Sequence, residues 1–147
     1  MNFKPLACQN LRDYRAVKTG VENLKNRLDE LNDKISNIRV IYDPDRSPGG
    51  GSSTTSEEDK LLIAQDEVVM LKPVYEYKRN EVERIERSLR ILTAEQRLIL
   101  TRFHISRPEN HIDVLCNELH IEKSQVYDRH EAALRAFTKA MYAIVDG

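Results

Sequence analysis

Two long stretches of this chain carry apolar residues at alternating spacings of three and four, and this pattern constrains the fold more than any other feature. A spacing that averages 3.5 residues aligns the apolar side chains along one stripe of an α-helix, which is typical of a coiled-coil seam. We therefore predict two long helices that pack on each other. The first seam comprises Tyr14, Val17, Val21, Leu24, Leu28, Leu31, Ile35, Ile38 and Tyr42, and the second comprises Leu61, Ala64, Val68, Leu71, Tyr75, Lys78, Val82, Ile85, Leu89 and Leu92.

The segment between the two seams has the composition of a flexible linker. It runs from Asp43 to Ser56 as DPDRSPGGGSSTTS, with two prolines and three consecutive glycines. Ser56 and Asp59 are typical of the N-cap and third position of a helix, and we expect the second helix to begin there. The heptad phase is the same on both sides of Pro73, which predicts one helix kinked at the proline.

A linker of this length can reverse the chain but cannot run back along a helix of roughly 50 Å. We therefore predict an antiparallel helical hairpin, a coiled coil, over residues 1–92, with the linker at 43–56. Two helices with one seam each bury little surface, so we expect the hairpin to need the C-terminal domain, a second copy or another protein to complete its core. Of these we expect self-association as a homodimer.

The remaining residues, 93–147, are predicted to form a helix-turn-helix domain. Thr93 and Gln96 match a capping box that opens a helix through Phe103, and a break follows at 107–110. The stretch 112–134 then predicts two short helices joined by a tight turn, the second running from Lys123 to about Val145. The apolar residues that would hold these two helices at a steep angle are Leu115, Cys116, Leu119, Ile121 and Val126. The predicted fold class is all-α throughout.

The start of the last helix carries the candidate functional residues. In the major groove, the amide of Gln125 could read adenine, and Arg129 could reach guanine or phosphate. Acidic side chains are unfavourable near phosphates, although a carboxylate can accept a hydrogen bond from cytosine. An ordinary solvated helix face is the competing interpretation of the same pattern. The residues that we expect to contact double-stranded DNA are Lys123, Ser124, Gln125, Tyr127, Asp128 and Arg129.

Charge gives this interpretation little help. The formal net charge is −1, and Lys plus Arg against Asp plus Glu number 8 against 5 in residues 1–42, 8 against 11 in 43–92 and 7 against 8 in 93–147. DNA-binding proteins usually carry a basic face that displaces phosphate counterions. We therefore expect modest affinity that depends on a few residues, on a second subunit or on a partner protein.

Several other classes of protein are not expected. No apolar run is long enough for a membrane span, and the first ten residues lack the core of a signal peptide, so a cytoplasmic protein that binds no membrane is expected. Neither a catalytic arrangement nor a cofactor motif is present, which disfavours an enzyme. The spacing of His111, Cys116 and His120 is a poor match to zinc sites. His130 lies on the apolar side of the last helix, where we expect a packed and hydrogen-bonded ring.

The runs LTAEQRLILTRF and LCNELHIEKSQVYDRHEAALRAF resemble region 4 of sigma-70-type factors and the related phage-encoded late-transcription activators of Gram-positive hosts, the autolysin-regulator type. The hairpin with its SPGGGS linker also looks like small phage and prophage proteins of this group. In this sequence the family's turn glycine is His120, its N-cap serine is Glu122, and Arg129 occupies a position that is often apolar. The matching residues are Leu119, Ile121, Ser124, Val126, Tyr127, Arg129, His130, Ala133 and Leu134.

The resemblance implies a sequence-specific DNA-binding regulator that activates late phage genes, with contact to host RNA polymerase. The alternative is a coiled-coil protein-interaction module that binds RNA polymerase or another regulator without reading DNA. The near-neutral charge, together with Asp128 and Glu131 on the would-be reading face, favours this alternative.

Overall fold

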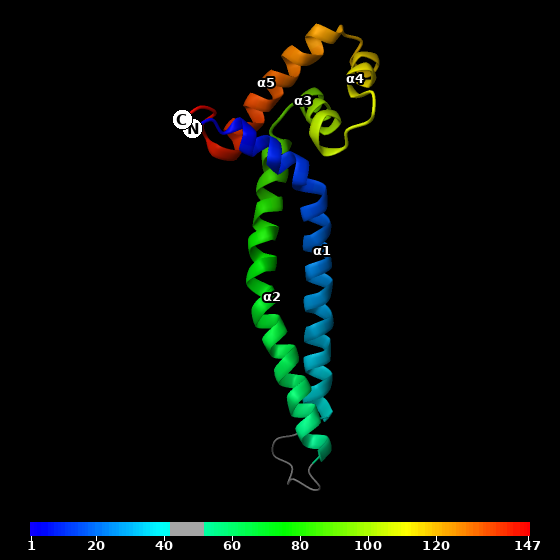
Figure 1. The fold of residues 1–147 in the computed structure, drawn as a ribbon, viewed down its shortest axis with the longest axis vertical. Helices are drawn as coiled ribbons and strands as arrows, with labels where there is room; N and C mark the ends of the chain where they lie inside the picture. Colours follow the sequence, from blue (N-terminus) through cyan, green and yellow to red (C-terminus); the bar gives the residue numbers. More distant parts are fainter. Residues whose placement is uncertain (42–51) are drawn as a thin grey trace. The chain divides into compact units, whose positions relative to one another are not determined.

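The computed structural model describes residues 1–41 and 52–147, and this part of the chain is helical, as the sequence predicts (Figure 1). No β-strand forms among the described residues, where one isolated bridge pairs Asn2 with Asp146. None of the described helices has the length and apolar character needed to cross a membrane. In chain order the elements are α1 (Lys4–Ile41), α2 (Ser52–Arg90), α3 (Ala94–Leu100), the π-helical turn η1 (Thr101–Ile105), α4 (His111–Leu119) and α5 (Lys123–Tyr142).

Helix α2 begins before its predicted start. Ser56 lies inside the helix, so its prediction as N-cap, and with it the end of the linker at Ser56, is wrong. Serine and threonine are only mild helix breakers, so a run of them is compatible with the first turns of a helix. The predicted linker residues 43–51 and the seam residue Tyr42 lie outside the described residues. The helix continues through Pro73, as the unchanged heptad phase predicts.

The chain divides into two compact units that do not follow the predicted boundary at residue 92. The central unit is residues 19–79, and the terminal unit joins residues 1–18 to residues 80–147. The long helices α1 and α2 therefore contribute to both units. The prediction assigned the whole of residues 1–92 to a hairpin, but the first turns of α1 and the last turns of α2 also pack with the C-terminal helices.

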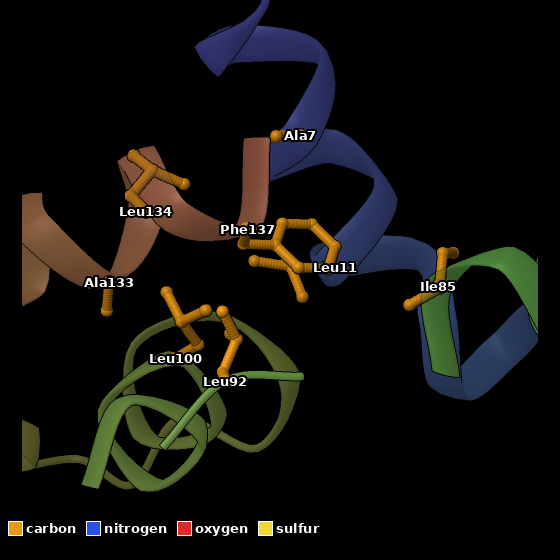
Figure 2. Close-up of a cluster of buried hydrophobic side chains, with 8 residues drawn as sticks. All are labelled: Ala7, Leu11, Ile85, Leu92, Leu100, Ala133, Leu134 and Phe137. Carbon is orange, nitrogen blue, oxygen red and sulfur yellow. The ribbon is translucent and has the colours of Figure 1, made fainter. Parts of the chain in front are cut away.

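The main core of the terminal unit draws on α1, α2, α3 and α5 (Figure 2). Phe137 is fully buried at its centre, together with Leu11 from α1 and Leu100 from α3. The start of α1 is held to α5 by stacking of Phe3 on Tyr142, with ring centroids 5.3 Å apart. The full set of buried residues is Ala7, Leu11, Ile85, Leu92, Leu100, Ala133, Leu134 and Phe137.

A second cluster of the terminal unit joins α3, α4 and the start of α5. Ile99, Leu115 and Val126 are all completely buried there. The partly buried Cys116, Leu119 and Ile121 pack around them, so the cluster contains all five apolar residues that the sequence assigned to this region. The cluster fixes the first turn of α5 against α4, and so determines which side chains of α5 face outward.

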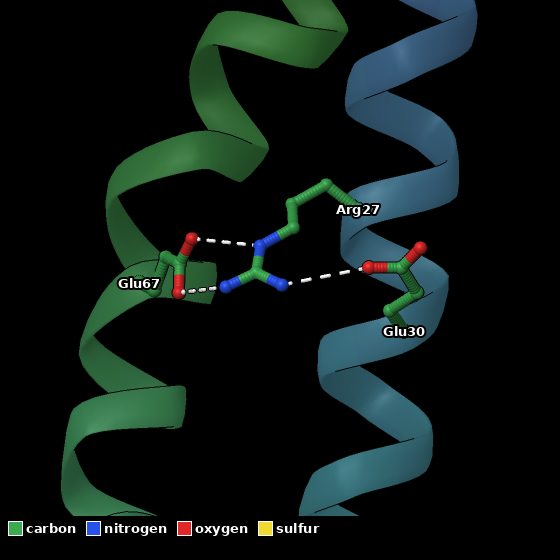
Figure 3. Close-up of polar contacts among 3 residues, drawn as sticks. All are labelled: Arg27, Glu30 and Glu67. Atoms are coloured by element: carbon green, nitrogen blue, oxygen red, sulfur yellow. Dashed lines mark hydrogen bonds and ion pairs between the residues drawn. The ribbon is translucent and has the colours of Figure 1, made fainter.

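In the central unit, α1 and α2 run side by side in opposite directions. Leu31 and Ile35 pack with Ala64, and the surrounding Leu61, Val68 and Leu71 belong to the predicted second seam. Figure 3 shows an ion pair alongside this contact: the Arg27 guanidinium donates to both carboxylate oxygens of Glu67 at 2.9 Å and also contacts Glu30. Hydrogen bonding to Arg27 holds the pKa of Glu67 below its ordinary value.

Candidate nucleic-acid interface

The turn between α4 and α5 depends on one left-handed residue. His120 has φ 55° and ψ 46°, and its N–H donates to the carbonyl of Cys116 at the end of α4. Among non-glycine residues, histidine is one of those that adopt this region most readily. The chain therefore makes its tight turn without a glycine, and α5 begins three residues later at Lys123.

The beginning of α5 exposes all six residues that the sequence nominated for DNA contact. Val126 points into the core and is completely buried, whereas its neighbours on both sides face solvent. The six fall within the first two turns of one helix and, at 100° per residue, are spread over about 240° of its circumference. They are Lys123, Ser124, Gln125, Tyr127, Asp128 and Arg129.

Gln125 has a structural role that sequence reasoning missed. Its side-chain oxygen accepts a hydrogen bond from the backbone N–H of Glu122 at 3.0 Å, which is half of a capping box at the start of α5. Glu122 itself has the extended backbone of an N-cap residue. Bidentate contact with adenine would require the side chain to turn outward from the start of the helix, so the predicted base-reading role of Gln125 competes with its capping role.

Arg129 also has a partner within the protein, with which it forms an ion pair. Its Nη1 lies 2.7 Å from Oε1 of Glu95 on α3, and the two side chains are 43% and 40% exposed. Exposed ion pairs contribute about 0–1 kcal/mol, so Arg129 can leave Glu95 at small cost. No sequence pattern indicates this pair, because 34 residues separate its members.

Behind this surface lies a group of rings centred on the π-helical turn. Phe103 of η1 stacks on His130 with centroids 3.9 Å apart, and Tyr127 meets Phe103 edge-on at 6.3 Å. The Nε2 atoms of His104 and His130 are 2.9 Å apart, so one donates a hydrogen bond and the other accepts it. The prediction that His130 is packed and hydrogen-bonded is confirmed. Single π-helical turns occur frequently at functional sites.

Burial keeps this histidine pair neutral. It lowers the pKa of His104 to about 4, with the neighbouring His130 acting in the same direction, and burial also lowers the pKa of His130. In the unfolded chain a histidine titrates near pH 6.5. Above pH 6.5 the two histidines are unprotonated in both the folded and the unfolded chain. Below pH 6.5 they become protonated in the unfolded chain but stay neutral in the folded one.

We expect the free energy of unfolding to fall as the pH drops from about 6.5 towards 4. Urea unfolding at pH 7.5, 6.5 and 5.5 would measure this, and His104→Gln should reduce the difference between pH 7.5 and 5.5. His120→Asn is the matched control, because this residue is exposed, takes no part in the pair, and asparagine tolerates its left-handed backbone. If the free energy of unfolding of His104→Gln depended on pH as strongly as that of the unchanged protein, the lowered pKa of His104 would be contradicted.

A second cationic surface lies elsewhere in the terminal unit. Arg15, Arg102 and Arg107 line an open hollow of about 480 Å³ together with Ser106. Arg15 donates to the Ser106 hydroxyl at 3.0 Å, and Arg107 contacts a ring nitrogen of His111, both neutral partners. Only Arg102 contacts a carboxylate, that of Glu118. The sequence could not indicate this group, because Arg15 reaches it from α1.

Other sites are not evident in the described residues, where no three His, Cys, Asp or Glu side chains are grouped as metal ligands. No protein-family model, curated protein or solved structure matches this chain.

Proposed function

We propose that this protein is a phage-type transcription regulator that binds double-stranded DNA, with α4 and α5 acting as a helix-turn-helix and the first two turns of α5 as the recognition surface. The observation that carries the proposal is the outward display of all six nominated residues around the buried Val126. The resemblance to sigma-70 region 4 and to late-transcription activators of the autolysin-regulator type favours activation over repression.

Each side chain has a defined part in this proposal. Lys123 and Ser124 stand at the N-terminus of α5, where backbone N–H groups and the helix dipole also attract phosphate. Tyr127 is half-exposed and can donate its hydroxyl to the DNA backbone. Arg129 would exchange Glu95 for guanine or phosphate, and Asp128 would accept from a cytosine amino group.

Charge supports the proposal more strongly when it is counted over the terminal unit. Residues 1–18 carry 4 Lys and Arg against 1 Asp, and residues 80–147 carry 10 against 11 Asp and Glu, which gives 14 against 12, or +2. The central unit carries 9 against 12, or −3. The unit that contains the recognition surface is therefore the one of the two that carries a net positive charge.

The central unit completes the proposal as a coiled-coil hairpin that pairs two copies of the chain or contacts host RNA polymerase. The apolar packing of α1 on α2 and the bidentate contact of Arg27 with Glu67 support a hairpin of this kind.

The test is DNA binding by fluorescence polarisation, with duplexes that tile the intergenic DNA around the gene for this chain. We expect one duplex to bind well above the rest, and Lys123→Glu to weaken that binding at least tenfold. Lys139→Glu makes the same charge change near the end of α5 and should have a much smaller effect. The slope of log affinity against log salt should become less steep in Lys123→Glu, because a phosphate contact is lost.

Folded protein that binds no duplex at low salt would contradict the proposal and favour the second candidate, a protein-interaction module that contacts RNA polymerase or another regulator. The engagement of Gln125 as a cap and of Arg129 with Glu95 favours this candidate. A pull-down of purified RNA polymerase would test it directly, and Lys123→Glu should then leave capture unchanged.

A further inference from the structure

We infer that the hollow lined by Arg15, Arg102 and Arg107, called here the arginine hollow, binds a small molecule that carries a phosphate monoester. All of its lining residues belong to the terminal unit. Its volume of about 480 Å³ falls in the range of small-molecule sites in proteins. The described residues of its lining include a serine and three apolar side chains besides the arginines, and no carboxylate.

The three guanidinium groups reach the arginine hollow from different parts of the chain. Arg15 comes from α1, Arg102 from η1, and Arg107 from the segment between η1 and α4. Nη1 of Arg15 donates to the Ser106 hydroxyl at 3.0 Å, and Nε of Arg107 donates to Nδ1 of His111 at 3.3 Å. A guanidinium has about five N–H donors, so both arginines keep several for a ligand. Three cations held together with few acceptors suit an anion that accepts many hydrogen bonds.

Charge favours a phosphate monoester over a carboxylate as this anion. Among the described residues, one carboxylate contacts the three arginines: Glu118 accepts from Nε of Arg102 at 3.1 Å. Three positive charges and one negative charge leave a net +2 at the hollow. A phosphate monoester carries a charge of about −1.5 to −2 near pH 7 and offers three strong acceptor oxygens. A carboxylate offers two oxygens and one charge, which a single guanidinium can satisfy.

Two histidines beside the arginine hollow are affected by the same positive charge. Desolvation lowers the pKa of His111, and the charge of Arg107 lowers it further. Arg12 and Arg107 also help to lower the pKa of His104, after burial and the neighbouring His130. Among the described residues, no carboxylate is one of the groups that shift these two pKa values. The surroundings of Arg107 are therefore positive.

The apolar part of the lining suits the organic part of such a molecule. Ile105, Pro108 and Val114 line the arginine hollow and are each partly buried. Small-molecule sites usually combine apolar walls with a few polar groups that fix the orientation of the ligand. A flat group such as a nucleobase could pack on these side chains while its phosphate meets the arginines. We therefore expect a phosphorylated organic molecule to bind more tightly than inorganic phosphate.

The arginine hollow is separate from the proposed recognition surface. It lies beside residues 105–108, before the N-terminus of α4, whereas the start of α5 follows the C-terminal end of α4. The nine residues of α4 extend over roughly 13 Å at 1.5 Å per residue. The concave shape and the apolar side favour a small molecule over a DNA backbone, which presents only phosphates and sugars. The inference does not rest on DNA binding, since ligand binding is measured on the protein alone.

Isothermal titration calorimetry of the full chain tests the inference, with AMP and phenyl phosphate as probes. We expect one molecule of each to bind per chain, AMP with a Kd below about 1 mM, a modest affinity for a ligand of its size. Inorganic phosphate should bind more weakly, and adenosine should not bind.

Arg15→Gln and Arg107→Gln should each weaken AMP binding at least tenfold. Circular dichroism should show unchanged helix content, because both side chains are exposed. Arg135→Gln is the matched control, since it removes the same charge from an exposed position of the same unit that does not line the hollow. It should bind AMP as the unchanged protein does.

Amide signals in the NMR spectrum of isotope-labelled protein locate the site. AMP should shift the signals of Arg15 and Ser106, which are 91 residues apart in the chain, and that of Arg107. The signals of Lys123 and Ser124 should stay unchanged, whereas an anion bound at the start of α5 would shift these two instead.

Four results would each overturn the inference. They are failure of both probes to bind, AMP binding that survives both variants, an equal loss in Arg135→Gln, and shifts confined to the start of α5. If the arginines contacted DNA instead, AMP would not bind, and Arg15→Gln and Arg107→Gln would weaken duplex binding as strongly as Lys123→Glu. That result would also overturn the inference.

Discussion

Phe137→Ala should lower the free energy of unfolding of the terminal unit by about 3–5 kcal/mol, the usual cost of removing a fully buried phenylalanine. Phe137 is 0% exposed and packs among Leu11, Leu100 and Leu134, which come from three different helices (Figure 2). A cavity at this point cannot be closed by the movement of one helix alone. Urea unfolding of the full chain followed by circular dichroism would measure the loss.

The control for this prediction is Ile91→Ala in the same unit. Ile91 is 72% exposed, so its truncation should change the free energy of unfolding by less than about 0.5 kcal/mol. A similar, small loss in both variants would show that Phe137 does not occupy a packed core.

Local pattern was sufficient to predict the long helices, because apolar spacing reports which face of a helix is buried without saying what covers it. The capping box of Thr93 and Gln96 was likewise predictable: each side chain bonds the other's backbone N–H at 3.1 Å within one helical turn. The start of α2 was not, since serine and threonine are compatible with both a cap and a first turn.

The boundary between the units shows the limit of such reasoning. The spacing of the first seam continues backwards from Tyr14 to Leu11 and Ala7, so the sequence does indicate that these residues are buried. It does not indicate their partners, which lie more than 70 residues away on α2, α3 and α5. The prediction assigned residues 1–18 to the hairpin together with their net positive charge, and so the net charge of the terminal unit was underestimated.

In the candidate interface, likewise, the exposure of side chains was predictable from the sequence, whereas their contacts were not. Exposure of Lys123 or Tyr127 follows from their position beside the buried Val126 on a helix. The contacts that modify the surface do not follow, because Glu95 and Phe103 come from elements that only the tertiary fold brings near α5. Those contacts decide whether Arg129 and Tyr127 are available to a ligand.

Leu11→Ala should destabilise the C-terminal helices, although this residue lies more than a hundred positions before the end of α5. Leu11 is 0% exposed and belongs to the same cluster as Phe137, Ala133 and Leu100. Leucine truncation at such sites costs about 2–5 kcal/mol. Hydrogen–deuterium exchange of the full chain should therefore speed up in α3 and around Ala133 to Phe137, as well as at the start of α1.

Leu28→Ala provides the matched comparison, because it is the same change at a buried position on the same helix, within the central unit. Its effect on exchange should be concentrated in the central unit and spare α5. If instead both leucine variants left α5 protected, the N-terminal turns would belong with the hairpin and the unit boundary near residue 92 would be restored. If Leu11→Ala alone exposes α5, the domain that carries the recognition surface includes both ends of the chain, and a fragment of residues 93–147 lacks part of its core.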